Sequence, residues 1–352
     1  MIEWLANPLR DPELEASDDD APLRFHRALT GYAPSALIDA PELAAEWGVG
    51  QVRLKFERER FGLPSFKFLG ASWAARRLLG EPPHDPELEL IAATDGNHGR
   101  AVARVARLAG LGALILVPAG TATARIDAIA DEGAEVEVVD GSYDDAVRRS
   151  EALAGPRRLL LSDTSWPGYE EVPRWVIEGY ATIFREVDEQ MGGAAADAVV
   201  VPIGVGALAA AAVRHLAGCA RLAGVEPASA ACTLESVRAG EITEVPGPHP
   251  SIMAGLNAGL PSLVAWPLVS AGFDLFCAIE DQVAVEGMRR LAALGLEAGE
   301  CSGGAVGAAM RLFAEPRARE ALGAGPTSSV LVLLTEAVTD PDAYVRLVGR
   351  PD

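Results

Sequence analysis

A single amine with unusual neighbours is the first candidate for chemistry in this chain. Lysine occurs only at Lys55 and Lys67, and every other Lys or Arg position holds arginine. Arginine stays protonated in proteins, whereas a desolvated lysine can lose its proton and form a Schiff base. Lys67 stands between Phe66 and Phe68 at the expected start of a helix, and both settings lower an ammonium pKa. We expect Lys67 to form a Schiff base. The alternative is that its aliphatic chain lies along the surface of an amphipathic helix and its ammonium reaches solvent. We interpret Lys55 as a lysine on a strand that was retained by chance.

A glycine-rich turn follows an apolar run in "VVVPIGVGALAAAA". Gly204 and Gly206 let the backbone approach a phosphate closely, and the start of the next helix favours an anion. The same stretch also satisfies the dinucleotide fingerprint, with Ala209 at its third position and Glu226 at the end of the next strand. The pattern therefore predicts a phosphate site, a dinucleotide site or a simple tight turn.

Two further turns carry carboxylates at the ends of expected strands. In "IAATDGNHGRAVA" the strand ends at Thr94 and the turn holds Asp95, Asn97 and His98, while in "LLLSDTSWPGYEEVPRW" Asp163 follows a strand. Residues of this kind often do no more than cap turns and helices. At the carboxyl edge of a parallel sheet they would also face a shared cleft, where two carboxylates can act as acid and base. Both interpretations stay open on the local pattern.

Taken together, the lysine and the glycine loop favour pyridoxal phosphate (PLP) over a nicotinamide. Nicotinamide chemistry needs no lysine imine, and its fingerprint usually lies at the first strand of a domain. Here the glycine loop lies deep in the chain. A nicotinamide-dependent dehydrogenase using "GVGALA" and Glu226 remains an alternative.

Strands and helices must alternate to place these turns at one edge. After a loop-rich, acidic stretch of 40 residues, a strand is expected at 51–59 and a helix at 65–80, with Ser65 as its N-cap. Strands then alternate with helices from residue 88, which predicts right-handed βαβ units and parallel sheets. One long helix, 169–191, joins two such series. We expect an α/β fold of two lobes with a cleft between them. The expected strands are 88–94, 112–118, 134–140, 157–163, 197–204, 221–227 and 327–337; the expected helices between them are 96–110, 122–133, 142–155 and 207–218.

Composition excludes several classes of function. The formal net charge of −20 argues against nucleic-acid and anionic-membrane partners. The four cysteines and five histidines show no metal-ligand spacing, so we expect no metal site and reduced thiols in a cytoplasmic protein. The acidic N-terminus lacks an apolar signal core, and the longest apolar run is too short to span a bilayer.

The chain resembles the fold-type II PLP enzymes of the tryptophan synthase β superfamily, and within them it is most similar to diaminopropionate ammonia-lyases. The matching segments run in the order found in that family, from residue 64 to residue 344. The blocks "TDGNHGR" and "DTSWPGYEEVP" are specific to the lyase group. The resemblance implies a large PLP-binding domain (1–87 and 193–352), a small α/β domain (88–192) and a homodimer. The other matching blocks are "PSFKFLGAS", "PIGVGALA", "GVEP", "SIMAGLNAG" and "LLTEAVTDPDAY".

The resemblance also implies roles for individual residues. Lys67 would hold PLP as an imine and act as a base, and Asn97 would hydrogen-bond the 3′-oxygen of the cofactor. Thr335 would place a neutral hydroxyl beside the pyridine nitrogen, which suits elimination. Asp95 and Asp163 would be the acid/base carboxylates. The phosphate would be held by backbone amides of Gly204, Val205, Gly206, Ala207 and Leu208.

The implied reaction is the α,β-elimination of 2,3-diaminopropionate, or a close analogue, to pyruvate and ammonia. The β-amine needs protonation because a free amide is a very poor leaving group. A serine or threonine dehydratase-like PLP enzyme is an alternative, and a non-catalytic metabolite sensor is another. The chain departs from the family pattern at Ala71, Cys301, Ser302 and Ala337, which leaves the exact substrate open.

Overall fold

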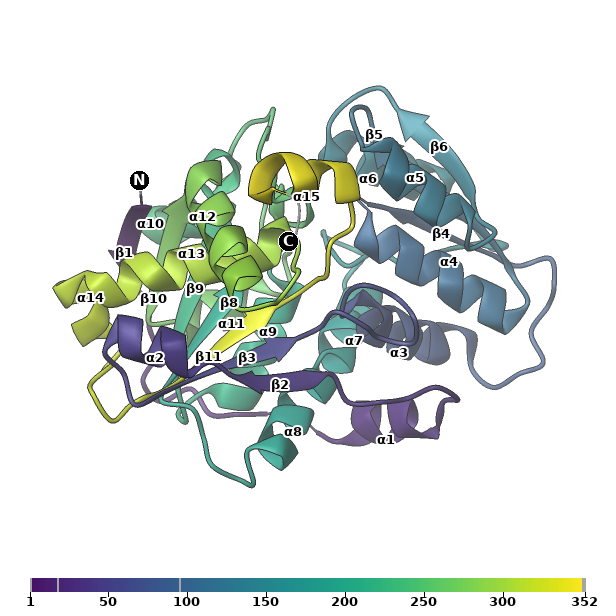
Figure 1. Ribbon diagram of the computed structural model, residues 1–352. Coiled ribbons are helices and arrows are strands. Elements are labelled where there is room, and N and C mark those ends of the chain that lie inside the picture. The colour runs from purple at the N-terminus through teal and green to yellow at the C-terminus, as the bar shows by residue number, and fades with distance from the viewer. Residues whose placement is uncertain (1, 18, 95, 350–352) are drawn as a thin grey trace.

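The computed structural model describes residues 2–17, 19–94 and 96–349 of the 352-residue chain. Two sheets lie side by side, and helices cover both (Figure 1). The large sheet has seven strands in the order β1-β10-β9-β8-β11-β3-β2, and the small sheet has four in the order β6-β5-β4-β7. The α/β fold expected from the alternating pattern is therefore confirmed.

The interior of the large sheet is parallel, and its two edge strands are antiparallel to their neighbours. Every residue of β8 and β10 is buried, as is typical of parallel strands that helices cover on both faces. The strands of this sheet are β1 (Ile2–Ala6), β2 (Ala36–Asp39), β3 (Gln51–Phe56), β8 (Ala198–Pro202), β9 (Arg221–Pro227), β10 (Leu275–Ile279) and β11 (Ser329–Leu334).

All strand pairs of the small sheet are parallel. Its strands are β4 (Glu89–Ala93), β5 (Gly112–Pro118), β6 (Glu135–Val139) and β7 (Arg158–Leu160). The α-helices of the described chain are α1 (Ala21–Ala28), α2 (Pro41–Trp47), α3 (Lys67–Leu79), α4 (Asn97–Ala109), α5 (Thr123–Ala130), α6 (Tyr143–Leu153), α7 (Glu171–Gly179), α8 (Ala181–Gln190), α9 (Ala207–Leu216), α10 (Cys232–Ala239), α11 (Trp266–Gly272), α12 (Asp281–Ala293), α13 (Glu300–Ala314), α14 (Pro316–Ala321) and α15 (Pro341–Val348).

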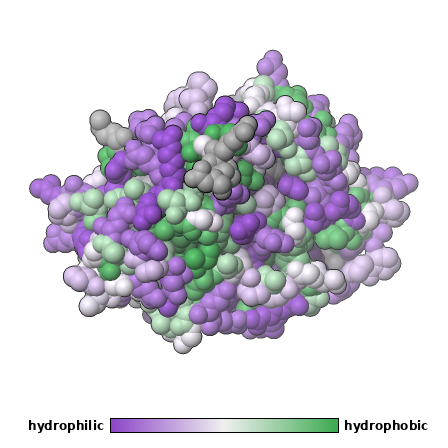
Figure 2. Space-filling model, in the orientation of Figure 1, coloured by the Kyte–Doolittle hydropathy of each residue, from purple (hydrophilic) through white to green (hydrophobic). Residues whose placement is uncertain are grey.

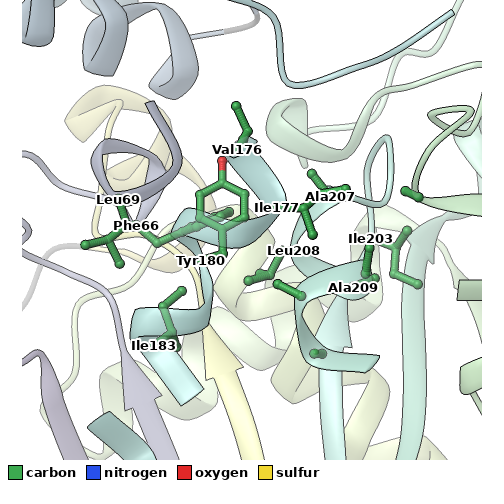
Figure 3. Packing of buried hydrophobic residues seen from close by; sticks show 14 of the residues in the cluster. Phe66, Leu69, Val176, Ile177, Tyr180, Ile183, Ile203, Ala207, Leu208 and Ala209 are labelled. Carbon is green, nitrogen blue, oxygen red and sulfur yellow. The ribbon is translucent and has the colours of Figure 1, made fainter. Parts of the chain in front are cut away.

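The helices α3, α7 and α9 pack together between the two sheets. Figure 3 shows the buried Tyr180 ring among side chains from all three segments, including Phe66, Leu69 and Leu208. A Cβ atom at Gly70 would lie 2.6 Å from Cε1 of Tyr180, so glycine lets α3 approach this ring closely. One hydrophobic cluster runs from the small sheet through these helices to the large sheet, and it anchors the start of α3.

The expected helix over 169–191 is wrong as a single element. It divides into α7 and α8, because the amide of Tyr180 donates to the Ile177 carbonyl at 3.2 Å in a tighter, 3₁₀-type turn. At Gly179 a Cβ atom would lie 2.5 Å from the Leu69 carbonyl oxygen, so the chain is pressed against α3 there. The break thus follows a close tertiary contact that helical periodicity does not report.

The first 40 residues contain more regular structure than expected. They supply β1, α1 and β2, and both strands close edges of the large sheet by antiparallel pairing. The proposed N-cap is also wrong: the residue before α3 is Phe66, and no side chain caps the helix there. Ser65 instead forms an isolated β-bridge with Glu336, which ties the segment before Lys67 to the segment after β11.

Lys55 is not a lysine left by chance on a strand. Its side chain is fully buried, and Nζ donates to Glu186 Oε2 at 2.7 Å, Gln190 Oε1 at 2.9 Å and the Ser35 carbonyl at 3.0 Å. The buried Arg60 guanidinium shares Glu186 with it, at 2.6 Å. Each ammonium hydrogen therefore has a partner, as a buried charge requires.

The strands agree with a division into two lobes, since residues 2–56 and 198–334 supply the large sheet and residues 89–160 the small one. The domain boundaries themselves, 1–87 with 193–352 and 88–192, remain a prediction.

Polar and apolar side chains are interspersed over the face in Figure 2. Among the described residues, no helix combines the length and the apolar character needed to cross a bilayer.

Candidate active site

One cavity brings together most of the residues that the sequence marked for chemistry. It lies where β4, β8 and β11 end, and the first residue of α3 faces it. This position, at the carboxyl ends of parallel strands, is where α/β folds place their ligands. Asp95 lies outside the described residues. Of the other candidates, the cavity is lined by Lys67, Asn97, Asp163, Gly204, Val205, Gly206, Ala207, Leu208 and Thr335.

Backbone pairing holds Lys67 at the cavity wall. The amide of Ala337 donates to the Pro64 carbonyl at 2.9 Å, next to the bridge between Ser65 and Glu336. The Lys67 ammonium lies 5.3 Å from the centroid of the Phe66 ring. Its side chain keeps 17% of its surface exposed, so the amine remains reachable from the cavity.

Lys67 and Asp163 form an ion pair, with 2.6 Å between Nζ and Oδ2. Burial by itself favours the neutral amine, but the Asp163 carboxylate outweighs it and raises the pKa of Lys67 above its ordinary value. The depressed pKa expected from the phenylalanine neighbours and the helix start is therefore wrong. Burial also works to raise the pKa of Asp163, but His98 and Lys67 together hold it at about 2.

His98 is a site residue that the sequence showed only as part of a turn. It is buried in the first turn of α4, and Nε2 donates to the Leu161 carbonyl at 2.9 Å. Nδ1 lies 3.8 Å from Asp163 Oδ2 and has no hydrogen-bond partner among the described residues. Burial lowers the pKa of His98, while the nearby Asp163 carboxylate acts in the opposite direction. Its place beside Asn97 in "DGNHG" is the signal that could have revealed it.

The glycine loop is built so that its backbone stays open to the cavity. A Cβ atom at Gly204 would lie 3.0 Å from the Gly255 carbonyl oxygen. Gly206 has φ of 99°, a conformation that side chains rarely adopt, and a Cβ atom there would lie 3.2 Å from Cβ of Ala265. The ten-residue α9 starts directly afterwards, so its first N–H groups have no partner within the helix. This arrangement suits a phosphate group.

Glu226 does not belong to this site, which removes the dinucleotide interpretation. Its side chain is fully buried, and it accepts hydrogen bonds of 2.8 Å from the amides of Thr233 and Leu234 at the start of α10. Burial raises its pKa to about 7. A carboxylate turned to a helix N-terminus inside the core cannot reach a ribose hydroxyl in the cavity.

Thr335 and Asn97 offer polar groups to the cavity from opposite lobes. The Thr335 hydroxyl is buried and has no hydrogen-bond partner among the described residues. An unpaired buried hydroxyl is costly, so this atom is available to a polar group that enters the cavity. The Asn97 amide donates to the carboxylate of Glu336, the residue after Thr335. Glu336 also accepts a hydrogen bond of 3.2 Å from the Cys301 amide, so it joins α4 to the start of α13.

The four departures from the family pattern occupy different places. Cys301 lines the cavity and is buried. Ser302 is buried beneath it, where its hydroxyl donates to the Glu336 carbonyl at 2.8 Å and accepts from the Glu336 amide at 3.0 Å. Ala71 is buried within α3, and Ala337 makes the backbone pairing with Pro64 described above. Of the four, Cys301 alone is among the described residues that line the cavity.

Among the described residues, no three His, Cys, Asp or Glu side chains are grouped as metal ligands.

Comparison with known proteins points in the same direction as this geometry. The family described as pyridoxal-phosphate dependent enzymes matches residues 28–336. Diaminopropionate ammonia-lyase of Escherichia coli (strain K12) is 35% identical to this chain, over 92% of it and 89% of that protein. The Salmonella typhimurium protein of the same name is 32% identical, over 93% of this chain and 90% of its own.

Solved structures agree in fold over nearly the whole chain. The crystal structure of the Escherichia coli diaminopropionate ammonia lyase in complex with an aminoacrylate-PLP azomethine reaction intermediate matches with a TM-score of 0.91 and 32% identity. That match covers 99% of this chain and 97% of the other. The complex of the same enzyme with D-serine matches equally well. This chain therefore belongs to the family of pyridoxal-phosphate dependent enzymes, with the fold-type II architecture.

Proposed function

We propose that this protein is a PLP-dependent lyase that converts 2,3-diaminopropionate and water to pyruvate and two molecules of ammonia. The observation that carries the proposal is the Lys67–Asp163 pair, 2.6 Å apart, facing the same cavity as the glycine loop. Similarity to diaminopropionate ammonia-lyases over more than nine tenths of the chain supports this substrate.

The residues present fit the cofactor. A primary amine, a glycine cradle and an unpaired buried hydroxyl line one cavity, and PLP carries an aldehyde, a phosphate and a ring nitrogen to match them. Lys67 would hold the aldehyde carbon, and the amides of 204–208 would hold the phosphate. Thr335 would hydrogen-bond the ring nitrogen without charging it. Asn97 would hydrogen-bond the 3′-oxygen.

When bound, PLP supplies a carbonyl for imine formation and an electron sink for the α-carbon. Lys67 must lose a proton from Nζ before it can react, and Oδ2 of Asp163, 2.6 Å away, opposes that loss as long as the ion pair is intact, because it favours the ammonium.

The carboxylates would also handle the substrate's β-amino group. As an anion, Asp163 attracts the β-ammonium, and as an acid it can keep the leaving nitrogen protonated. We propose that Asp95 shares the acid/base work, although it lies outside the described residues. The neutral Thr335 hydroxyl would leave the ring nitrogen unprotonated, which favours elimination.

A panel of amino acids assayed for pyruvate and ammonia tests the substrate. Both enantiomers of diaminopropionate belong in the panel, together with serine and threonine. We expect the highest kcat/KM with a diaminopropionate enantiomer and two ammonia molecules for each pyruvate. A higher kcat/KM with serine would identify a dehydratase instead and overturn the proposal.

We further propose that the protein is a cytoplasmic homodimer. Resemblance to the family supports the assembly, and the acidic, cysteine-poor composition supports the compartment. Sedimentation equilibrium of the purified chain should give twice the 36.8 kDa mass of one chain. A single-chain mass at all protein concentrations would contradict the dimer.

A further inference from the structure

Hydrogen bonds connect the loop that carries Asp163 to a segment of the other lobe. Ser165, two residues after Asp163, is 6% exposed, and Ser262 is fully buried. Their hydroxyl oxygens lie 2.7 Å apart. The amide of Val264 donates to the Ser165 hydroxyl at 2.9 Å, and the amide of Leu263 donates to the Ser165 carbonyl at 3.3 Å. Ser165 is therefore fastened to residues 262–264 through both its side chain and its backbone.

The same segment orients the glycine loop. The amide of Ser262 donates to the Val205 carbonyl at 2.8 Å. The N–H of Gly206 belongs to the same planar peptide unit and so points away from Ser262. Ala265 also packs closely against Gly206, because a Cβ atom added at Gly206 would lie 3.2 Å from the Cβ of Ala265. Residues 262–265 thus decide where a proposed phosphate-binding amide points.

The near end of the Asp163 loop is also fixed. The Tyr169 hydroxyl donates to the Leu160 carbonyl at 2.8 Å and accepts from the Ser162 amide at 3.0 Å. Asp163 therefore lies between one anchor at Ser162 and another at Ser165. Of these two anchors, Ser165 is the one that reaches the glycine loop.

We propose that the Ser165–Ser262 hydrogen bond couples the position of Asp163 to phosphate binding at the glycine loop. Both serines are positioning residues, and the inference rests on the phosphate cradle of the proposed function. A phosphate that fixes the position of the Gly206 amide also restricts the motion of residues 262–265. Through its hydrogen bond to Ser262, Ser165 then restricts the motion of Asp163. By linkage, the coupling acts equally in the reverse direction.

Hydrogen–deuterium exchange of the full-length, PLP-free chain, with and without inorganic phosphate, tests the coupling. In the wild type we expect phosphate to slow exchange of residues 204–208 and also of residues 160–169. In Ser165→Ala the first effect should remain and the second should be lost. Ser262→Ala breaks the same hydrogen bond from its other side, so the test survives if one variant fails to fold. Ser150→Ala is the matched control, because its buried hydroxyl donates to the Val147 carbonyl within α6 and, in the described part of the chain, makes no bond to the other lobe.

The outcomes separate the two proposals. If phosphate slows exchange of residues 204–208 but not of residues 160–169 in the wild type, the proposed coupling is wrong, while the proposed phosphate site at the glycine loop is retained. If phosphate protects neither segment, the proposed phosphate site at the glycine loop is wrong, and so is the coupling that depends on it. Persistent protection of residues 160–169 in both serine variants would also overturn the coupling.

Affinity for PLP gives an independent measure. Loss of one hydroxyl hydrogen bond of about 1 kcal/mol should weaken PLP binding about fivefold in Ser262→Ala. Ser165→Ala also loses the bond from the Val264 amide, so it should weaken binding at least as much. The double variant should bind PLP no more weakly than Ser165→Ala, because that substitution already removes the bond to Ser262. Single-variant effects that multiply in the double variant would mean two separate contributions and would contradict the pair.

Discussion

One of the two lysines of this chain is fully buried and the other is partly exposed, and their surroundings differ in kind. The Lys55 ammonium uses all three of its hydrogens on Glu186, Gln190 and the Ser35 carbonyl, and its side chain has no exposed surface. Among the described residues the Lys67 ammonium donates to Asp163 alone, and its side chain is 17% exposed and lines a cavity. A saturated ammonium is held as a structural element, whereas one with a single partner beside an open cavity can exchange that partner for a ligand.

Replacing Lys67 should produce the largest effect, and the quantity affected should be catalytic activity. Lys67→Ala should lower kcat/KM by about a thousandfold or more, because no other lysine lies in the cavity to act as nucleophile. Borohydride reduction followed by mass measurement should show no PLP attached to the variant. Lys67→Arg is the control that keeps the charge without the nucleophile, and it should be equally inactive. Covalent PLP on either variant would mean that the imine forms elsewhere.

Replacing Lys55 should affect stability instead. Lys55→Met leaves part of the Glu186 charge uncompensated, so the free energy of unfolding should fall by about 3 kcal/mol. Urea denaturation of the PLP-free protein measures this, and kcat per folded molecule should stay at the wild-type value. Arg53→Met is a matched control on the same strand, where the partner Asp39 is exposed; it should cost less than about 1 kcal/mol. A loss of kcat in Lys55→Met would break the contrast between the two lysines.

The Lys67–Asp163 pair should also leave a pH signature of intermediate size. The pKa of Asp163 is lowered to about 2 from an ordinary value of 3.8, so its stabilising contribution is present above pH 4 and is lost as the pH falls toward 2. The raised pKa of Lys67 acts in the opposite sense: its contribution is present below its ordinary pKa of 10.5 and is lost as the pH rises through the raised value.

Asp163→Asn should therefore be less stable than the wild type by about 2 kcal/mol at neutral pH. Chemical denaturation at a series of pH values should show this difference shrinking between pH 4 and pH 2. A difference that stays constant over that range would mean that Asp163 contributes by packing rather than by charge.

The smallest effect is expected on replacing Thr335. Unlike the other substitutions, this one should leave the stability of the PLP-free protein unchanged or slightly increased. Thr335→Val removes a buried hydroxyl that has no partner among the described residues, so the PLP-free protein should be as stable as the wild type or slightly more stable. PLP binding should weaken about five- to tenfold, because the ring nitrogen loses its hydrogen bond. PLP titration and thermal unfolding measure the two effects. A marked loss of stability without PLP would show that the hydroxyl already has a partner.

Residues with local signals were predicted well. The glycine loop, the strand-end turns and the alternation of strands and helices rest on periodicity and turn chemistry within a few residues. Glu226 and His98 could not be placed from the sequence, because their contacts lie outside their own segments. Glu226 has fingerprint spacing, but its carboxylate faces α10. His98 looked like a turn residue, but helix α4 directs it at Asp163.

What the sequence determined by itself was the α/β class and the kind of chemistry that one amine and one glycine loop allow. Those properties depend on residue type and on order along the chain. The tertiary structure decided the partners: Asp163 for Lys67 across 96 residues, Glu186 for Lys55 across 131, and the edge strands β1 and β2 for the large sheet. Partners so far apart are chosen by the packing of two lobes and by the cost of leaving a buried charge unpaired, which no local pattern encodes.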